Sequence, residues 1–270
     1  MPKLKVNNVT LHYTDEGPGL PAKPETIVFS HGLLLNGSIF ADQIKHLRSR
    51  YRCITYDHRG QGASELATDG FDIDNLTRDA AELIKAMDVG PCHFIGLSMG
   101  GFVGLRLAIK HPQLVKSLTL IDTSAEPDGA FKNFRYKLVN FIAKNFGLKI
   151  VVGQVMPFMF GKTFIKDPAR KDELEKWRRV SMSNDPLTIT RAVTGVINRT
   201  DIRDQLKRIT CPTLILVGEE DITTPPEKSV TMHREIKGSK YQVIPRAGHI
   251  ATVENPDAVN LAINGFLGQV

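Results

Sequence analysis

The sequence predicts an α/β protein built on a mostly parallel, doubly wound β-sheet with a block of helices inserted into it. Short runs rich in β-branched and aromatic residues alternate with longer helical patterns through the first 124 residues and again after about residue 200. Most of these runs are nearly continuous in Val, Ile, Leu and Phe, as strands buried on both faces are. This alternation is typical of strands joined by crossover helices, so the sheet is expected to be mostly parallel.

The expected strands follow one another along the chain. The first two, LKV and VTLHY, form a hairpin around Asn7-Asn8. The others are residues 26–30, 53–57, 93–97, 117–122, 213–218 and 241–245. Two sets of apolar residues at helical spacing predict helices that pack on the sheet: Ile73, Leu76, Ala80, Leu83, Ile84 and Met87, then Leu261, Ile263, Phe266 and Leu267.

Residues 125–198 interrupt the alternation. FRYKLVNFIAKNFGLKIVVGQVMPFMFG and ELEKWRRVSM are helical patterns rich in Phe, Met and Lys, without a clear strand partner. Because this stretch far exceeds the usual connection between elements, we predict a helical cap at 125–198, inserted into a core formed by 1–124 and 199–270. The alternative is a set of ordinary crossover helices.

Composition and charge limit the classes of partner. The 35 Lys and Arg residues are interleaved with 29 Asp and Glu, so we interpret the formal net charge of +6 as surface charge and predict no nucleic-acid partner. No run approaches the roughly 18 apolar residues of a membrane helix, and the first residues lack the apolar core of a signal peptide. We therefore expect a cytoplasmic protein with no membrane partner. Its oligomeric state is left open.

The three cysteines, Cys53, Cys92 and Cys211, lie at or beside expected strands and have no CxxC spacing. We expect buried free thiols, neither a disulfide nor a metal site, and no cofactor.

The stretch HFIGLSMGGF places Ser98 between an apolar strand and an expected helix. Gly96-Leu97-Ser98-Met99-Gly100 matches G-x-S-x-G, in which a nucleophile sits on a strained strand-to-helix turn. Gly96 and Gly100 remove side chains that would clash with the strand and the helix. The helix start directs free N–H groups at the serine, so the Met99 N–H is a candidate donor to an oxyanion. The alternative is a tight β–α turn with no catalytic role.

A serine needs a base, and the base needs a carboxylate to orient it, in the chain order Ser, Asp or Glu, His. Only His233 and His249 lie in the final third of the chain, and His233 falls within a helical run. His249 follows the expected strand at 241–245 and a glycine, in a loop where its ring can lean over the sheet edge. His249 is therefore the predicted base.

Four carboxylates are candidates for the acid. Asp221 fits best, because its loop follows the strand just before the one that precedes His249. Its neighbours Glu219 and Glu220 are expected to be solvated or to hold the loop. Asp122 remains the alternative, since it ends the strand that follows the nucleophile helix.

The loop after residues 26–30 is expected to supply a second oxyanion donor. Gly32 lets the backbone approach the reacting carbonyl, and the Leu33 N–H can then point into the site. The ring of His31 is expected to brace this loop by hydrogen bonds rather than to catalyse.

Together these motifs resemble the α/β-hydrolase superfamily over nearly the whole chain. The resemblance rests on His31-Gly32, the D-x-R-G-x-G-x-S loop of Asp57 to Ser64, the Ser98 turn, the Gly218 to Asp221 loop and Gly248-His249. It is most similar to the capped group that includes 3-oxoadipate enol-lactonases, cofactor-free haloperoxidase-like esterases and meta-cleavage C–C hydrolases. Related dehalogenases and epoxide hydrolases carry an aspartate at the turn, so a serine argues against both.

The resemblance implies an α/β-hydrolase fold, a Ser98/Asp221/His249 triad and oxyanion donors at Leu33 and Met99. It implies hydrolysis of a small-molecule ester or lactone through an acyl-enzyme, in a pocket between the cap and the strand ends; the loop from Asp57 to Ser64 is structural. Two alternatives share the triad: C–C bond hydrolysis or perhydrolysis by peroxide, and a slow hydrolase-like ligand receptor or signalling protein.

Cap side chains are expected to form apolar pocket walls in a minority of cases and to pack within the cap otherwise. The apolar candidates are Phe131, Phe134, Phe141, Phe146, Met156, Phe158, Met159 and Phe160. The basic residues Lys132, Arg135, Lys137 and Lys144 either attract a carboxylate-bearing substrate or form a solvated face.

Overall fold

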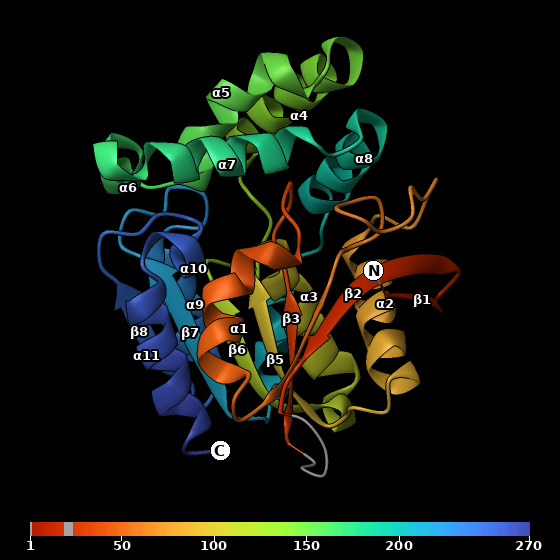
Figure 1. Ribbon diagram of the computed structural model, residues 1–270, viewed down its shortest axis with the longest axis vertical. Coiled ribbons are helices and arrows are strands. Elements are labelled where there is room, and N and C mark those ends of the chain that lie inside the picture. The colour runs from red at the N-terminus through yellow and green to blue at the C-terminus, as the bar shows by residue number, and fades with distance from the viewer. Residues whose placement is uncertain (1, 19–23) are drawn as a thin grey trace.

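The computed structural model describes residues 2–18 and 24–270 as an eight-stranded sheet flanked by helices (Figure 1). The strand order is β1-β2-β4-β3-β5-β6-β7-β8. β2 pairs antiparallel with β1 and β4, and the other pairs are parallel, as predicted. The strands are β1 Lys3–Val6, β2 Val9–Glu16, β3 Thr26–Ser30, β4 Arg52–Tyr56, β5 Cys92–Leu97, β6 Val115–Ile121, β7 Thr213–Gly218 and β8 Lys240–Ile244.

All expected strands are present, with boundaries that differ by at most three residues. Asn7 and Asn8 have φ of 43° and 61°, as a tight turn between β1 and β2 requires. Among the six strands from β3 to β8, the expectation of burial is wrong only for β8, where three of five residues are exposed; β1, at the other edge of the sheet, also exposes two of its four residues. β8 is an edge strand with one neighbour, so its outer side is open to solvent.

Successive strand residues face opposite sides of the sheet and build two cores. Val28 and Phe94 pack with α2 and α3 on one side. Phe29 and Ile95 pack with α1 and α11 on the other. The helices around the sheet are α1 Ala41–Leu47, α2 Ile73–Ala86, α3 Met99–Lys110, α9 Pro226–Glu235, α10 Ala251–Glu254 and α11 Pro256–Leu267, with short 3-10 turns η1 Gly37–Phe40, η2 Pro112–Leu114, η3 Pro168–Arg170 and η4 Arg203–Arg208.

The two predicted helix faces have different outcomes. In α2 the whole set from Ile73 to Ile84 is buried, and Met87 follows at the helix end. In α11 Ile263, Phe266 and Leu267 are buried, but Leu261 is 74% exposed. The α11 face that reaches the sheet begins at Val259, and Leu261 lies on the far side of the helix from it.

Residues 130–197, which follow β6 and precede β7 in the sequence, form a layer of helices that we call the α4–α8 layer. Its helices are α4 Ala130–Phe146, α5 Leu148–Met159, α6 Lys162–Lys166, α7 Lys171–Met182 and α8 Pro186–Ile197. Figure 1 shows these helices together at the top of the molecule, away from the lower ends of the strands. The division into a core (1–124 and 199–270) and a cap (125–198) stays a prediction.

The α4–α8 layer is tied to the loops beneath it by hydrogen bonds. The Gly161 N–H donates to Glu254 Oε2 over 2.8 Å, and the Thr223 hydroxyl donates to the Phe158 carbonyl over 2.6 Å. The Asn184 amide donates to the Leu34 carbonyl over 3.0 Å. These contacts reach the end of α10 and two separate loops, so they fix the layer's position at several points.

All three cysteines are free thiols. Cys53 and Cys92 are buried as expected, and burial raises the pKa of each thiol to about 12. Cys211 is only half-buried, because it precedes β7 instead of lying within it.

The start of α3 packs closely against the end of β3. A Cβ on Gly100 would lie 1.9 Å from the Ser30 carbonyl oxygen, and a Cβ on Gly96 would lie 2.3 Å from the Gly100 oxygen. Both obstacles are backbone atoms, which cannot rotate away. The glycines on either side of Ser98 are therefore required by the packing, as the sequence predicted.

We expect Gly100→Ala to lower the free energy of unfolding by about 3 kcal/mol or more, because overpacking against fixed backbone is costly. Urea unfolding measures this. Gly265→Ala is the matched control: it also adds a methyl group within a helix, but among the described residues no atom lies within 4 Å of the new Cβ. The control should be neutral or stabilising by up to about 1 kcal/mol. Equal losses in the two variants would contradict the packing argument.

Candidate active site

Ser98 sits on the turn between β5 and α3 in a strained conformation. Its φ is 53° and its ψ −114°, in a region that non-glycine residues rarely occupy. The Ser98 N–H donates to the Ile121 carbonyl over 2.9 Å, which ties the turn to the end of β6. Strain of this kind persists only where the surroundings impose it, and it presents the serine hydroxyl to the cavity above the sheet.

The structure brings Ser98, His249 and Asp221 into one chain of hydrogen bonds. His249 Nε2 lies 2.8 Å from Ser98 Oγ, and His249 Nδ1 lies 2.9 Å from Asp221 Oδ2. A carboxylate accepts a hydrogen bond, so Asp221 fixes the proton on Nδ1. The lone pair on Nε2 is then directed at the serine hydroxyl.

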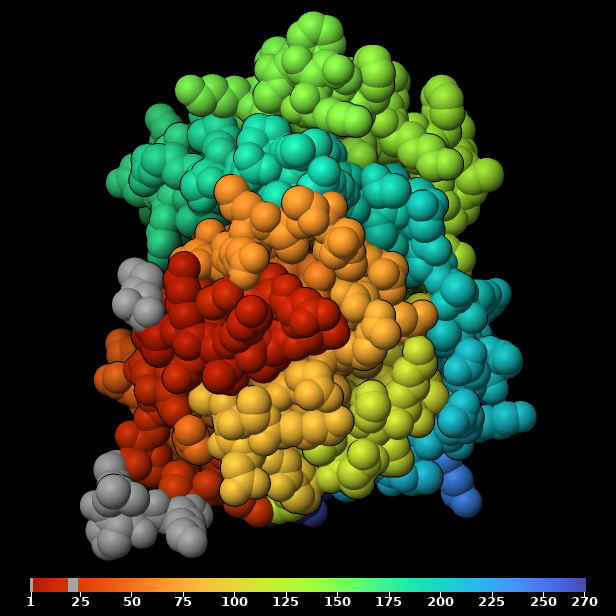
Figure 2. Space-filling view, turned by 90° about the vertical axis from the view of Figure 1, so that its right-hand side faces the viewer, coloured from red at the N-terminus to blue at the C-terminus, as the bar shows by residue number. Residues whose placement is uncertain are grey.

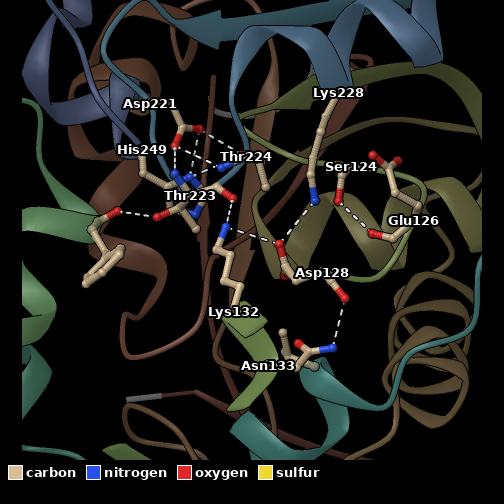
Figure 3. Close-up of polar contacts among 12 residues, drawn as sticks. Ser124, Glu126, Asp128, Lys132, Asn133, Asp221, Thr223, Thr224, Lys228 and His249 are labelled. Carbon is tan, nitrogen blue, oxygen red and sulfur yellow. Dashed lines mark hydrogen bonds and ion pairs between the residues drawn. The ribbon is translucent and has the colours of Figure 1, made fainter. Parts of the chain in front are cut away.

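Four donors hold the Asp221 carboxylate: three from Thr223 and Thr224, and the His249 ring. The N–H groups of Thr223 and Thr224 donate to Oδ1 over 2.7 and 3.0 Å, and the Thr224 hydroxyl donates to Oδ2 over 2.7 Å. Together with His249 Nδ1 these contacts hold both carboxylate oxygens (Figure 3). Thr223 and Thr224 were not predicted from the sequence. The run Asp221-Ile-Thr-Thr could have indicated them, because an aspartate can accept hydrogen bonds from the N–H groups that follow it.

The ionisation of the pair follows from its burial and mutual contact. Burial lowers the pKa of His249, but the charge and hydrogen bond of Asp221 outweigh burial, so the pKa is raised above its ordinary value. Burial raises the pKa of Asp221, but the charge of His249 and the hydrogen bonds from His249 and Thr224 outweigh it, so that pKa is lowered. Asp221 is therefore held as a carboxylate that favours the imidazolium form of His249.

Asp122, the alternative acid, contacts backbone groups in place of the imidazole. Its Oδ1 accepts from the Gly218 N–H over 2.7 Å, and its Oδ2 accepts from the Ala251 N–H over 3.0 Å. Burial, followed by the charge of Asp221, raises the pKa of Asp122 well above its ordinary value. Asp122 therefore links the end of β7 to the loop of His249 and makes no hydrogen bond to the histidine ring.

The other candidates lie outside the hydrogen-bond chain. Glu219 accepts from the Arg246 N–H over 3.1 Å, and Glu220 accepts from the Thr163 N–H over 2.8 Å, so both hold loops. His233 lies on α9, where its ring pairs with the Ser239 hydroxyl at 2.9 Å.

The two predicted oxyanion donors line the same cavity as Ser98 and His249. Leu33 follows β3, and Met99 is the first residue of α3. Within residues 2–18 and 24–270, neither N–H donates to a protein acceptor. Two free donors beside a nucleophile are what a developing oxyanion requires.

Hydrogen bonds hold the loop that carries Leu33. His31 Nδ1 bonds the Gly32 carbonyl at 2.7 Å, and its Nε2 accepts from the His58 N–H over 3.0 Å. Gln61 Oε1 accepts from the Leu34 N–H over 2.9 Å. Asp57 accepts from the Gly37 N–H, also over 2.9 Å. Every one of these contacts is structural, in agreement with the expectations for His31 and for the loop from Asp57 to Ser64.

A largely apolar cavity of about 570 Å³ lies between the candidate site and the α4–α8 layer. Its floor includes Ser98 and His249, and its walls include Val139, Val151 and Ile189 from the helices above. A cavity of this size and polarity suits a small organic molecule.

The expectation for the cap side chains is only partly correct. Phe131, Phe158 and Met159 line the cavity, and Met156 and Phe160 pack in the interior. Phe134, Phe141 and Phe146 do neither: they are 61–66% exposed. These three lie on the outer side of the layer, because the inner side of α4 already faces the cavity. Of the basic residues, Lys132 and Arg135 line the cavity, whereas Lys137 and Lys144 are exposed away from it.

A cluster of charges forms one wall of the cavity (Figure 3). The Asp128 carboxylate lies 3.1 Å from Lys132 Nζ, 3.1 Å from Lys228 Nζ and 3.2 Å from Arg199 Nη2. Burial raises the pKa of Asp128, but the three cations outweigh it and lower the pKa to about 2. Lys132 also donates to the Thr223 carbonyl, so the cluster connects α4 to the loop that holds Asp221. The sequence analysis missed Asp128.

The described residues contain neither a metal-binding group of side chains nor a membrane-spanning helix. No group of three or more His, Cys, Asp or Glu side chains in 2–18 and 24–270 could hold a metal ion. No helix in those ranges is both long and apolar enough to cross a membrane.

Comparison with known proteins identifies the family. Residues 25–256 match the model of the alpha/beta hydrolase fold family, and this chain belongs to that family. An enol-lactonase from Burkholderia xenovorans superposes with a TM-score of 0.92 at 26% identity, covering 99% of this chain and 100% of that one.

Two further proteins match over nearly their full length. A thermophilic esterase from Thermogutta terrifontis has a TM-score of 0.91 at 28% identity, over 100% of this chain and 99% of its own. A Mycobacterium tuberculosis relative that carries the name non-heme bromoperoxidase BpoC is 29% identical over 267 residues, 97% of this chain and 99% of its own. The resemblance inferred from the sequence is thus confirmed.

Asp122→Ala should lower the free energy of unfolding by about 2–6 kcal/mol, because two buried N–H groups lose their acceptor at roughly 1–3 kcal/mol each. Asp122→Asn keeps one acceptor oxygen of the same shape and should lose about half as much. Urea unfolding of the two variants measures this. A loss in Asp122→Ala no larger than in Asp122→Asn would contradict the bridging role.

Proposed function

We propose that this α/β-hydrolase is a serine hydrolase that cleaves a small carboxylic ester or lactone through an acyl-enzyme. The observation that carries the proposal is the hydrogen-bonded chain from Ser98 through His249 to Asp221 at the floor of an apolar cavity. The coarser statement, a hydrolase of the esterase or lactonase type, rests on the family and on full-length similarity to an enol-lactonase and an esterase.

The reaction begins with proton transfer. His249 Nε2 takes the Ser98 hydroxyl proton as Oγ attacks the substrate carbonyl carbon, and Asp221 stabilises the imidazolium that forms. The carbonyl oxygen becomes an oxyanion that accepts from the Leu33 and Met99 N–H groups. As the tetrahedral intermediate collapses, the C–O bond to the alcohol breaks and His249 returns the proton to the leaving oxygen.

Deacylation repeats these steps with water. His249 takes a proton from a water molecule, whose oxygen attacks the acyl carbon, and the same two N–H groups hold the second oxyanion. Collapse of this intermediate returns the proton to Ser98 Oγ and releases the acid. For a lactone, the alcohol and the acid are two ends of one product.

The cavity suits an apolar acyl or alkyl group with limited polar functionality, because helices of the proposed cap supply mostly aliphatic and aromatic walls. C–C bond hydrolysis, perhydrolysis by peroxide and slow turnover by a ligand receptor use the same three residues. Turnover of p-nitrophenyl esters of increasing acyl length separates a receptor and a C–C hydrolase from an esterase, since neither of the two would hydrolyse any of these esters rapidly.

We expect Ser98→Ala to reduce kcat/KM for the best p-nitrophenyl ester by about 10⁴-fold or more, because the nucleophile is lost while the oxyanion donors remain. Steady-state hydrolysis under identical conditions measures this. Ser49→Ala, at an exposed serine after α1, is the matched control and should keep wild-type activity. A Ser98→Ala protein that retained most of its activity would falsify the proposal.

The pH profile tests the acid. Catalysis needs neutral His249, and its raised pKa should put the acid limb of kcat/KM above about 6.5, the ordinary value for histidine. Asp221→Asn removes the charge that raises this pKa, so the limb should move to lower pH while kcat falls by about 10⁴-fold. Asp122→Asn should move the limb much less, because Asp122 makes no hydrogen bond to the ring. A larger shift in Asp122→Asn would reverse the assignment of the two carboxylates.

A further inference from the structure

The outer side of α4 and the start of α5 expose an unusual number of large apolar side chains. Phe131 is 77% exposed, Phe134 66% and Phe141 61%. Together with three neighbours of the same kind they form what we call the outer apolar face: Phe131, Phe134, Leu138, Phe141, Phe146 and Ile150. Single exposed apolar residues are ordinary, but six of them within twenty residues of chain indicate a surface that binds a partner.

Helix geometry places all of the α4 part of this face except Phe131 away from the cavity. Phe131, Phe134, Leu138 and Phe141 follow one another at spacings of three and four residues, so they lie along one side of α4. The residues on the other side, Tyr136, Val139, Asn140 and Ala143, line the cavity. Substrate binding thus accounts for the inner side of α4 and not for the outer one. Within the described part of the chain, no segment covers the outer side.

The charge around this face is of one sign. Residues 129–166 contain seven Lys and Arg and no Asp or Glu. The positive charge of this segment alone therefore exceeds the formal net charge of the whole chain, which is +6. The interpretation of the basic residues as interleaved with acidic ones is therefore wrong for this segment. Four of the seven, Arg135, Lys137, Lys144 and Lys149, are exposed on the same two helices as the apolar face.

The location of the face leaves it accessible to a large flat partner. In Figure 1 α4 and α5 lie at the top of the molecule, on the side of the α4–α8 layer away from the sheet. In Figure 2, turned by 90°, the light-green segment that contains them again forms the top. Nothing else in either view rises above these helices.

The combination of apolar and basic side chains selects the partner. A second copy of the chain would bring two clusters of cations together with no carboxylate in residues 129–166 to pair with them. A bilayer containing anionic phospholipid meets both requirements: Phe and Leu enter the boundary between headgroups and acyl chains, and Lys and Arg contact the phosphates. We propose that the outer apolar face and its flanking cations dock this protein on an anionic membrane surface.

Docking of this kind is peripheral. The sequence analysis predicted no membrane partner on the absence of an apolar run long enough to span a bilayer, and a helix that lies on a bilayer needs no such run. Phe131 and Arg135 belong both to this surface and to the cavity wall, so the bound membrane would lie next to the cavity. The proposal does not depend on the proposed hydrolase activity.

Co-sedimentation of the full chain with lipid vesicles tests the proposal. One set of vesicles contains phosphatidylcholine alone, and the other contains phosphatidylcholine with phosphatidylglycerol. We expect binding to the anionic vesicles to be at least about tenfold stronger, since each Lys or Arg near an anionic surface adds to the attraction. About 1 M salt should largely abolish that preference, because it reduces the Debye length to about 3 Å.

Two variants remove the apolar and the basic parts separately, and both change only exposed residues outside the cavity. The apolar variant is Phe134→Ser/Leu138→Ser/Phe141→Ser. Its matched control is Leu66→Ser/Val243→Ser/Leu261→Ser, which changes three exposed residues at separate places outside the α4–α8 layer. Lys137→Glu/Lys144→Glu is matched by Lys207→Glu/Lys237→Glu, which changes the net charge equally. Each variant on α4 should weaken binding to anionic vesicles at least about tenfold and its control less than threefold.

Other results overturn the proposal. They are no binding to either kind of vesicle, or equal losses in the α4 variants and their controls. A dimer in sedimentation velocity that the triple α4 variant dissociates, without vesicle binding, would assign the face to a second copy instead. Hydrolysis of a short soluble ester is measured in parallel and should be unchanged in all four variants, so failure of docking and failure of the hydrolase proposal are separate outcomes.

Discussion

The close packing of the α3 start against the end of β3 is the constraint on which the candidate site depends. Because Gly100 has no side chain, the helix can begin directly beside the Ser30 carbonyl. Next to this contact Ser98 has its positive φ, and Met99 lies in the lining of the cavity. The chain continues from Ser30 to Leu33, so the two candidate oxyanion donors come from the two segments that this contact holds together. The candidate nucleophile and the candidate donors thus lie on segments that one close backbone approach holds together.

The acid side of the site shows how two buried carboxylates so near each other acquire different roles. Asp122 accepts two backbone N–H groups and is pushed toward its neutral form, whereas Asp221 accepts from Thr223, Thr224 and His249 and stays ionised. The difference lies in the donors that each loop provides, because burial alone raises the pKa of both.

The features that the sequence predicted are those encoded locally. The Ser98 turn is contained within ten residues, and the chain order of Ser98, Asp221 and His249 follows from strand ends that share one edge of a parallel sheet. The charge cluster of Asp128 could not be predicted in this way, since its partners Arg199 and Lys228 lie 71 and 100 residues away in the sequence. Periodicity also failed for the exposed phenylalanines of α4. Apolar residues lie on both sides of that helix, so the pattern could not show which of them face the interior.

The two-sided α4 has a consequence for how such a protein can change over evolutionary time. Residues 136, 139, 140 and 143 of α4 face the cavity, while residues 134, 138 and 141 of the same helix face outward. Substitutions that remodel ligand preference and substitutions that alter where the molecule resides therefore fall on interleaved positions of a single segment. Because the two sets project from different sides of the helix, a substitution in one set leaves the side chains of the other set in place, so ligand preference and location in the cell can diverge separately.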